Sequence, residues 1–158
     1  MKHLSFPTQR THPKAIIPKK IAGNVAFDLH VVPDEDWVVR TVEGGSVERT
    51  FTLFGWESHL FHTGLKMAIP VGHGVLYRDR SGLAGKHNIH HMAGAIDCMY
   101  RGEWLIKLVN LSDKPYTFYE GDRIIQCVIV NEYKIDFVET QDLDETVRGE
   151  KGFGSSGR

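Results

Sequence analysis

The chain has 158 residues, which suits one domain that buries a core without disulfides or a structural metal. Its 19 lysines and arginines nearly cancel its 20 aspartates and glutamates, so it lacks the broad positive field expected of a protein that binds duplex nucleic acid. The two cysteines form no CxxC pair, and no stretch is apolar enough for a secretion signal or a membrane span. We therefore expect a soluble protein of the cytoplasm.

Segments rich in β-branched and aromatic residues alternate with turn residues along the chain, which predicts short strands. In chain order, the predicted strands are Val25–Val32, Trp37–Val42, Arg49–Phe54, Gly64–Ile69, Gly74–Arg78, Trp104–Asn110, Tyr116–Tyr119 and Arg123–Val130. A helical turn is expected only at Leu83–His87. Many short strands at regular spacing predict an all-β sandwich or barrel.

Two loops carry residues suited to phosphate chemistry. In Arg80-Ser81-Gly82, a glycine lets the backbone approach an anion, and arginine adds charge-assisted hydrogen bonds. Taken alone, this tripeptide is better explained as an N-capped helical turn. In the stretch 94–103, glycines bracket Asp97 and Tyr100, and a carboxylate in a pocket can orient and deprotonate a water. A solvated aspartate in a turn is the alternative.

Two further features are ambiguous when taken alone. Gln126 interrupts an otherwise apolar run, which also fits an outward-facing strand position. The segment 148–158 is rich in glycine and serine, as in a flexible tail, yet it also holds Arg148, which can pair with phosphate, and Phe153, which can stack on a base. His87, His90 and His91 have spacing too short for a structural zinc site, so we expect them to line a hairpin and the surface.

Taken together and in order, these segments resemble the five motifs of the trimeric dUTPase family. The motifs are AFDL at 26–29, RSGLAGKHNI at 80–89, GAIDCMYRGE at 94–103, GDRIIQCVIV at 121–130 and RGEKGFGSSG at 148–157. The resemblance implies a jelly-roll-like distorted β-barrel that forms a homotrimer. It divides the chain into an N-terminal extension (1–20), the barrel (21–147) and an active-site arm (148–158) that closes over a site built by the two other subunits.

The resemblance also implies an activity: hydrolysis of dUTP to dUMP and pyrophosphate with Mg²⁺, which limits uracil in DNA and supplies dUMP for dTTP synthesis. Asp97 would activate the water that attacks the α-phosphorus in line. Tyr100 would lie against the deoxyribose and leave no room for a 2′-hydroxyl. The hairpin at 89–94, continuing through Ile96, would bind the uracil edge through its backbone.

Further roles follow from the same resemblance. His91 and Gly94 would lie at the base, Phe153 would stack over it, and Asp28 would accept hydrogen bonds from water on Mg²⁺. Phosphate contacts are expected from Arg80, Ser81, Gly82, Gln126, Arg148, Gly154, Ser155 and Ser156. Neither direct nucleic-acid binding nor membrane binding is expected.

The chain departs from the family pattern at Ala26, Asp79 and Met99. Asp79 stands where proline is common, and we expect it to pair with Arg78 or Arg80, or to weaken phosphate binding. The aromatic stretch 37–62 matches no motif. It suggests a longer hairpin packed on the barrel or, less simply, a surface for a protein partner.

Two other functions fit the same fold. A dCTP deaminase-like enzyme would act on the cytosine ring, and a nucleotide-gated regulator would bind a partner protein without needing catalysis. The complete Arg80–Ala84 segment and the Asp97 and Tyr100 loop favour the hydrolase.

Overall fold

The largest sheet of the computed structural model, which describes residues 3–152, is organised around strand β12 (Arg123–Asn131). β12 pairs with β2 (Ala26–His30) on one edge and with β7 (His73–Arg78) on the other, and β7 also pairs with β9 (Ala95–Ile96). All of these pairings are antiparallel.

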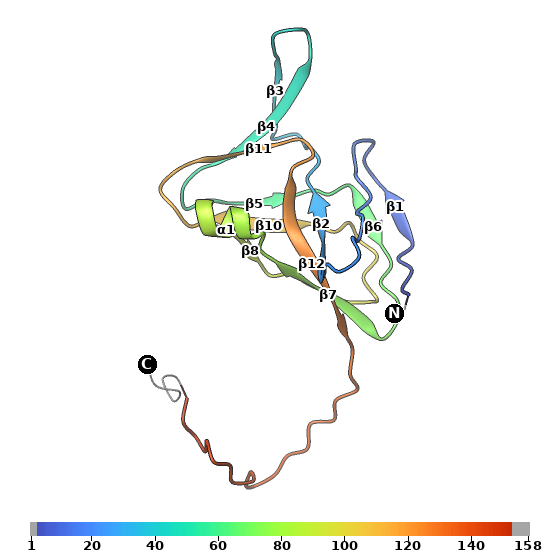
Figure 1. Cartoon of the computed structure of the whole chain (residues 1–158), viewed down its shortest axis with the longest axis vertical. Helices are drawn as coiled ribbons and strands as arrows, with labels where there is room; N and C mark the ends of the chain where they lie inside the picture. The colour runs from blue at the N-terminus through green and yellow to red at the C-terminus, as the bar shows by residue number, and fades with distance from the viewer. Residues whose placement is uncertain (1–2, 153–158) are drawn as a thin grey trace.

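Three smaller sheets complete the barrel (Figure 1). One contains β5 (Ser58–Phe61), β10 (Ile106–Asn110) and β8 (Ile89–Met92) in that order. Another contains β11 (Tyr116–Tyr119), β4 (Val47–Leu53) and β3 (Val38–Thr41), and the last pairs β1 (Thr8–Arg10) with β6 (Leu65–Met67). The predicted all-β fold in one domain is confirmed.

Alternating burial explains why the strands close around one core. In β10, Ile106, Leu108 and Asn110 are buried, whereas the residues between them are half-buried, as the two-residue period of a strand requires. Trp104 is fully buried, and its indole N–H donates to the carbonyl of Met67 at 3.2 Å. Burying each large apolar side chain stabilises the fold by about 1.5–3 kcal/mol.

Helix α1 (Ser81–His87) begins two residues before the predicted turn and ends at the residue predicted. Leu83 is its buried anchor. Asn88 ends the helix in the left-handed conformation, with φ of 54°, and its backbone N–H donates to the carbonyl of Ala84. Over residues 3–152, no helix has the length and apolar character needed to cross a bilayer.

The eight predicted strands are present, seven of them with shifted ends, and four short strands went unpredicted: β1, β5, β8 and β9. β1 shows that the N-terminal segment packs on the barrel through β6. Phe6 packs edge-on against Phe27, with ring centroids 6.3 Å apart, and Ala15 is buried in the core.

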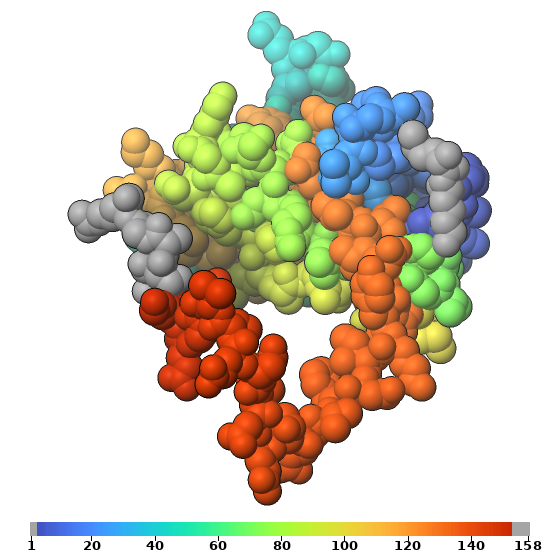
Figure 2. Space-filling view, turned by 60° about the horizontal axis from the view of Figure 1, so that its bottom comes forward, coloured from blue at the N-terminus to red at the C-terminus, as the bar shows by residue number. Residues whose placement is uncertain are grey.

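Two segments extend from the body. The β3–β4 hairpin projects at one end (Figure 1), while its base is held by buried Trp37 and by Phe51, which packs on Phe61 at a centroid distance of 5.4 Å. The base of the region 37–62 therefore packs on the barrel as expected, whereas the β3–β4 hairpin itself projects from it. A partner at this surface stays a prediction. At the other end, residues 132–152 are exposed and without regular structure, and they run away from the body (Figure 2).

Candidate active site

Neighbouring strands and the start of α1 place the predicted phosphate residues side by side. Asp28 on β2 lies opposite Gln126 on β12, and Gln126 lies opposite Arg78 on β7. β7 then leads through Arg80 into α1, which begins at Ser81. Three of the sequence motifs thus meet at one end of the main sheet, which we call the phosphate side.

Charge is concentrated around one carboxylate on the phosphate side. Oδ1 of Asp28 lies 3.4 Å from Nε of Arg80, and Oδ2 lies 3.3 Å from Nη1 of Arg123. Nη1 of Arg80 also donates to the carbonyl of Arg123 at 2.9 Å. Burial lowers the pKa of neighbouring His30. The negative charge of Asp28 acts in the opposite direction, but the positive charges of Arg123 and Arg80 lower the pKa further. His30 is therefore neutral at pH 7, and the two arginines supply the positive charge.

The arginines leave Ser81 and Gly82 accessible. Both residues are exposed, and nothing among residues 3–152 lies within 4 Å of a Cβ placed on Gly82. The amide of half-buried Gln126 has no hydrogen-bond partner in that part of the chain. A ligand can therefore contact the Ser81 hydroxyl, the exposed backbone at Gly82 and the side-chain amide of Gln126 at the same time.

The hairpin between β8 and β9 forms the second group of predicted residues, which we call the base side. Ala93 and Gly94 both have positive φ, of 63° and 112°. A Cβ on Gly94 would lie 2.7 Å from Cβ of Tyr77, and the Tyr77 N–H donates to the Gly94 carbonyl at 2.8 Å. This close approach requires glycine at 94.

Asp97 follows β9 at the start of a tight turn. The Tyr100 N–H donates to the Asp97 carbonyl at 3.1 Å, and Nη1 of Arg101 donates to the Cys98 carbonyl at 2.6 Å. The Asp97 side chain is exposed and makes no hydrogen bond or ion pair within residues 3–152. The turn thus holds a free carboxylate in a fixed place beside a cavity of about 170 Å³, which is lined by Ala95, Ile96, Asp97, Tyr100 and Leu105.

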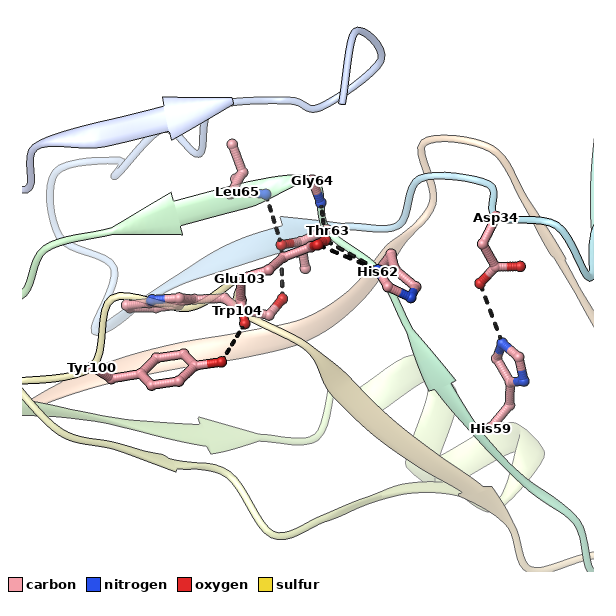
Figure 3. A network of polar contacts seen from close by, with 9 residues as sticks. All are labelled: Asp34, His59, His62, Thr63, Gly64, Leu65, Tyr100, Glu103 and Trp104. Atoms are coloured by element: carbon pink, nitrogen blue, oxygen red, sulfur yellow. Dashed lines mark hydrogen bonds and ion pairs between the residues drawn. The ribbon is translucent and has the colours of Figure 1, made fainter. Parts of the chain in front are cut away.

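Tyr100 is held over the same cavity by residues beyond the turn (Figure 3). Its hydroxyl donates to the Glu103 carbonyl at 2.8 Å, and its ring fills the space that a Cβ on Gly102 would need. The Glu103 carboxylate accepts from the Gly64 N–H at 2.7 Å and lies 3.3 Å from Nδ1 of His62. These contacts join the Tyr100 loop to the segment before β6.

Asp79 makes neither of the arginine pairs expected from the sequence. Its carboxylate accepts hydrogen bonds from Nδ1 of His90 at 2.8 Å and Nδ1 of His91 at 2.6 Å. Nη1 of Arg78 donates instead to the carbonyl of the preceding residue, and Arg80 turns toward Asp28. The expectation was wrong because the fold of β8 against the end of β7, which no local pattern encodes, brings the histidines closer.

Within one chain, Asp97 of the base side lies apart from the phosphate side, although the hairpin itself contacts the end of β7 where Gly94 meets Tyr77. β9 lies opposite Val75 and Leu76, near the start of β7, whereas Gln126 lies opposite Arg78 at its end. Three residues of strand separate the two positions by about 10 Å, and the chain continues from β9 to Asp97 in the direction away from Arg78. Asp97 and Gln126 therefore lie apart along the main sheet.

The predicted arm residues lie farther away. Arg148 is exposed, and its Nε donates to the Lys151 carbonyl at 3.0 Å rather than to the barrel. Phe153, Gly154, Ser155 and Ser156 lie outside the described residues.

The site residues fit a metal held through water rather than by direct protein ligands. Oδ1 of Asp28 is buried without a hydrogen-bond partner among residues 3–152, which makes it an acceptor for an ordered water. The two arginines beside it make a direct cation ligand unfavourable. Mg²⁺ commonly keeps several waters and binds through phosphates, so this arrangement suits it.

Reasoning from the sequence missed the residues that support the site: Arg101, Glu103 and Arg123. Each acts across a turn or between strands far apart in the sequence, so only strand register reveals the partner. The expected roles of the histidines were also incomplete. His87 packs against Tyr116 with ring centroids 4.7 Å apart, and His90 and His91 bind Asp79.

Comparisons with known proteins agree with this arrangement. The sequence model of the dUTPase family matches residues 46–157. The chain is 40% identical over 157 residues to the deoxyuridine 5'-triphosphate nucleotidohydrolase of Helicobacter pylori strain J99, covering 98% of this chain and 97% of the relative. It is 44% identical over 115 residues to the enzyme of that name from Fusobacterium nucleatum, covering 72% and 79%.

Solved structures share the fold. A mutant dUTPase of Staphylococcus bacteriophage 80alpha with dUpNHpp has a TM-score of 0.80 at 21% identity, covering 98% of this chain and 99% of that one. A mutant dUTPase from phage phi11 of S. aureus, described with a structural Mg(II) ion, has a TM-score of 0.72 at 18% identity, covering 89% and 99%. From the family match and the relatives together, the chain belongs to the dUTPase family.

Proposed function

We propose that this chain hydrolyses dUTP to dUMP and pyrophosphate at sites shared between the subunits of a homotrimer. The observation that carries this proposal is the free Asp97 carboxylate on a braced turn, beside a cavity closed on one side by the Tyr100 ring. The names of the relatives at 40% and 44% identity support the same substrate.

The base side supplies recognition and the attacking water. The backbone of the β8–β9 hairpin, near Gly94 and Ile96, binds the uracil edge, and the ring of Tyr100 lies against the deoxyribose and excludes a 2′-hydroxyl. His91 lies along the same hairpin. Asp97 accepts a proton from water as that water attacks the α-phosphorus in line, and such general base catalysis contributes about 10²–10⁴-fold.

The phosphate side holds the triphosphate. Ser81 and Gly82 donate to phosphate oxygens, Arg80 braces their loop through Asp28, and Gln126 contacts the α-phosphate. Asp28 would accept a hydrogen bond from a water of a bound cation. Mg²⁺, when bound, neutralises phosphate charge and favours departure of pyrophosphate.

Assembly from several subunits accounts for two features of the single chain. Asp97 follows β9, which pairs near the start of β7, whereas Gln126 lies opposite the end of β7, and this separation supports a site that another copy completes. Residues 132–152 leave the barrel exposed, as expected of an arm that reaches a neighbour. Arg148 then meets the γ-phosphate, Phe153 stacks over uracil, and Gly154, Ser155 and Ser156 donate to the terminal phosphates. Closure of this arm is a gating step.

The test is product analysis with separate nucleotides. Purified protein with Mg²⁺ is incubated with dUTP, dTTP, dCTP or UTP, beside an Asp97→Asn variant. We expect dUMP and pyrophosphate from dUTP alone and a loss of about 10²-fold or more in the variant. Conversion of dCTP would instead indicate a deaminase-like enzyme. Absence of dUTP turnover by folded protein would overturn the proposal and favour a nucleotide-gated regulator.

A further inference from the structure

One carboxylate that this mechanism does not use joins the two sides of the chain. Asp79 lies between β7 and α1, directly before Arg80. Its Oδ1 accepts from the backbone N–H of His91 at 2.8 Å and from Nδ1 of the same residue at 2.6 Å, and its Oδ2 accepts from Nδ1 of His90 at 2.8 Å. Three donors on one carboxylate define its position and that of both rings.

The hairpin needs such an anchor because it crosses between two sheets. β8 is the edge strand of the sheet that contains β10, whereas β9 is the edge strand of the sheet that contains β7. β9 pairs with β7 through two residue pairs only, Val75 with Ile96 and Leu76 with Ala95. On the free edge of β8, the Asp79 carboxylate accepts from the His91 N–H, where a further strand would present a carbonyl.

The hydrogen-bonding chemistry favours a charged Asp79. An ionised carboxylate only accepts hydrogen bonds, so each imidazole carries a proton on Nδ1. Burial works to raise the pKa of Asp79, but the hydrogen bonds from His91 and His90 lower it overall. Neither adjacent arginine takes part, because Arg78 donates to the Tyr77 carbonyl and Arg80 lies against Asp28.

We propose that Asp79 is a positioning residue that locks the hairpin at 89–96 to the phosphate loop at 80–82 through His90 and His91. This inference rests on the proposed hydrolysis. In a trimer, the loop and the hairpin of one chain serve two different sites. The Asp79 contacts therefore fix the position of Asp97, which acts in one site, relative to the phosphate loop of the same chain, which acts in a second site.

The expected kinetic signature is a loss in turnover rather than in binding. Many contacts hold the nucleotide, so KM changes little, by about twofold or less. In-line attack needs atoms placed within a fraction of an ångström, so Asp79→Ala lowers kcat about tenfold. Asp79→Asn keeps one acceptor oxygen, so its kcat lies between those of the wild type and the alanine variant.

A matched control uses another carboxylate–imidazole contact of the barrel. Oδ2 of Asp34 lies 3.6 Å from Nε2 of His59, and the Asp34 side chain is 18% exposed, against 25% for Asp79. Asp34→Asn neutralises the carboxylate of a similar contact at residues that belong to neither side of the site. We expect it to keep the wild-type kcat and KM.

A double-mutant cycle separates positioning from general instability. If Asp79 acts through His91, then Asp79→Asn combined with His91→Ala loses no more kcat than the larger single change. If the kcat losses of the two single variants multiply in the double variant, the proposal is overturned. A folded Asp79→Ala protein with the wild-type kcat would overturn it as well. If Asp79→Ala does not fold, the double-mutant cycle with Asp79→Asn and His91→Ala tests the proposal by itself. A wild-type protein that never turns over dUTP would instead refute the underlying function.

Discussion

Asp28 on β2 lies directly opposite Gln126 on β12, so the first and fourth sequence motifs are neighbours in one sheet. The 97 residues between them in the chain build most of the other strands, and β7 then brings the second motif to the opposite edge of β12. The third motif, with Asp97, and the fifth motif, in the arm, lie elsewhere. From this separation follows the central structural prediction, that a working site needs more than one chain.

Mixed trimers test shared sites directly. Asp97→Asn damages the base side and Gln126→Ala damages the phosphate side, so each homotrimer is expected to be inactive. Unfolding and refolding a 1:1 mixture gives random trimers, in which about a quarter of the pairings join an intact base side to an intact phosphate side. Steady-state assays of the mixture should recover about a quarter of wild-type activity. No recovery would mean that each site forms within one chain.

Removal of residues 148–158 tests the arm. Residues 132–152 are exposed and do not build the core, so the shortened protein should keep its far-UV circular dichroism and its Tm. Activity should fall by about 10²-fold or more, because several phosphate donors and the base-stacking ring are lost together. Full activity in the shortened protein would contradict a role for the arm in catalysis.

Gly94 should tolerate no side chain, for two separable reasons. Gly94→Ala places a methyl group against Tyr77 and also strains a backbone with φ of 112°. Gly72→Ala is the matched control, because its φ is 83° and no described atom lies within 4 Å of the new Cβ.

Urea unfolding of both variants measures the difference. We expect Gly94→Ala to lower the free energy of unfolding by about 2–4 kcal/mol and Gly72→Ala by about 1 kcal/mol. Equal losses would show that the contact with Tyr77 adds nothing to the backbone strain.

The stability contributed by Asp79 should depend on acid pH. Its pKa is lowered in the folded protein, so the folded state binds that proton less readily than the unfolded state. The contribution is complete above the unfolded pKa, which is near 3.8, and is lost as pH falls through the lower folded value.

The measurement compares wild type with Asp79→Asn at about pH 5 and about pH 3. The wild-type advantage in the free energy of unfolding should shrink at the lower pH. An advantage that stays constant or grows would contradict the carboxylate contacts with His90 and His91.

Much of this fold could be predicted from local patterns. Enrichment in β-branched and aromatic residues between turn residues located the long strands, and Tyr116–Tyr119 was predicted with its observed bounds. The missed strands are two to four residues long, and β8 carries His90 and His91, whose polarity conceals a strand that is stabilised by pairing with β10. Strands this short depend on their partners rather than on intrinsic preference.

The site was predictable to a different degree. The residues around Asp97 and Tyr100 and the resemblance to the dUTPase motifs indicated these two and Gln126 as candidates, but not what holds them. Arg123 reaches Asp28 across 95 residues of sequence, and Glu103 reaches Gly64 across 39. Contacts of this kind depend on strand register, which a single sequence does not encode locally.

Hydrolysis of dUTP in ¹⁸O-labelled water, followed by mass spectrometry of both products, tests the central claim most directly. Attack by an Asp97-activated water on the α-phosphorus predicts one ¹⁸O atom in dUMP and unlabelled pyrophosphate, with the labelled product missing in Asp97→Asn. Label in pyrophosphate, release of inorganic phosphate, or labelled dUMP formed at the wild-type rate by the variant would contradict the account.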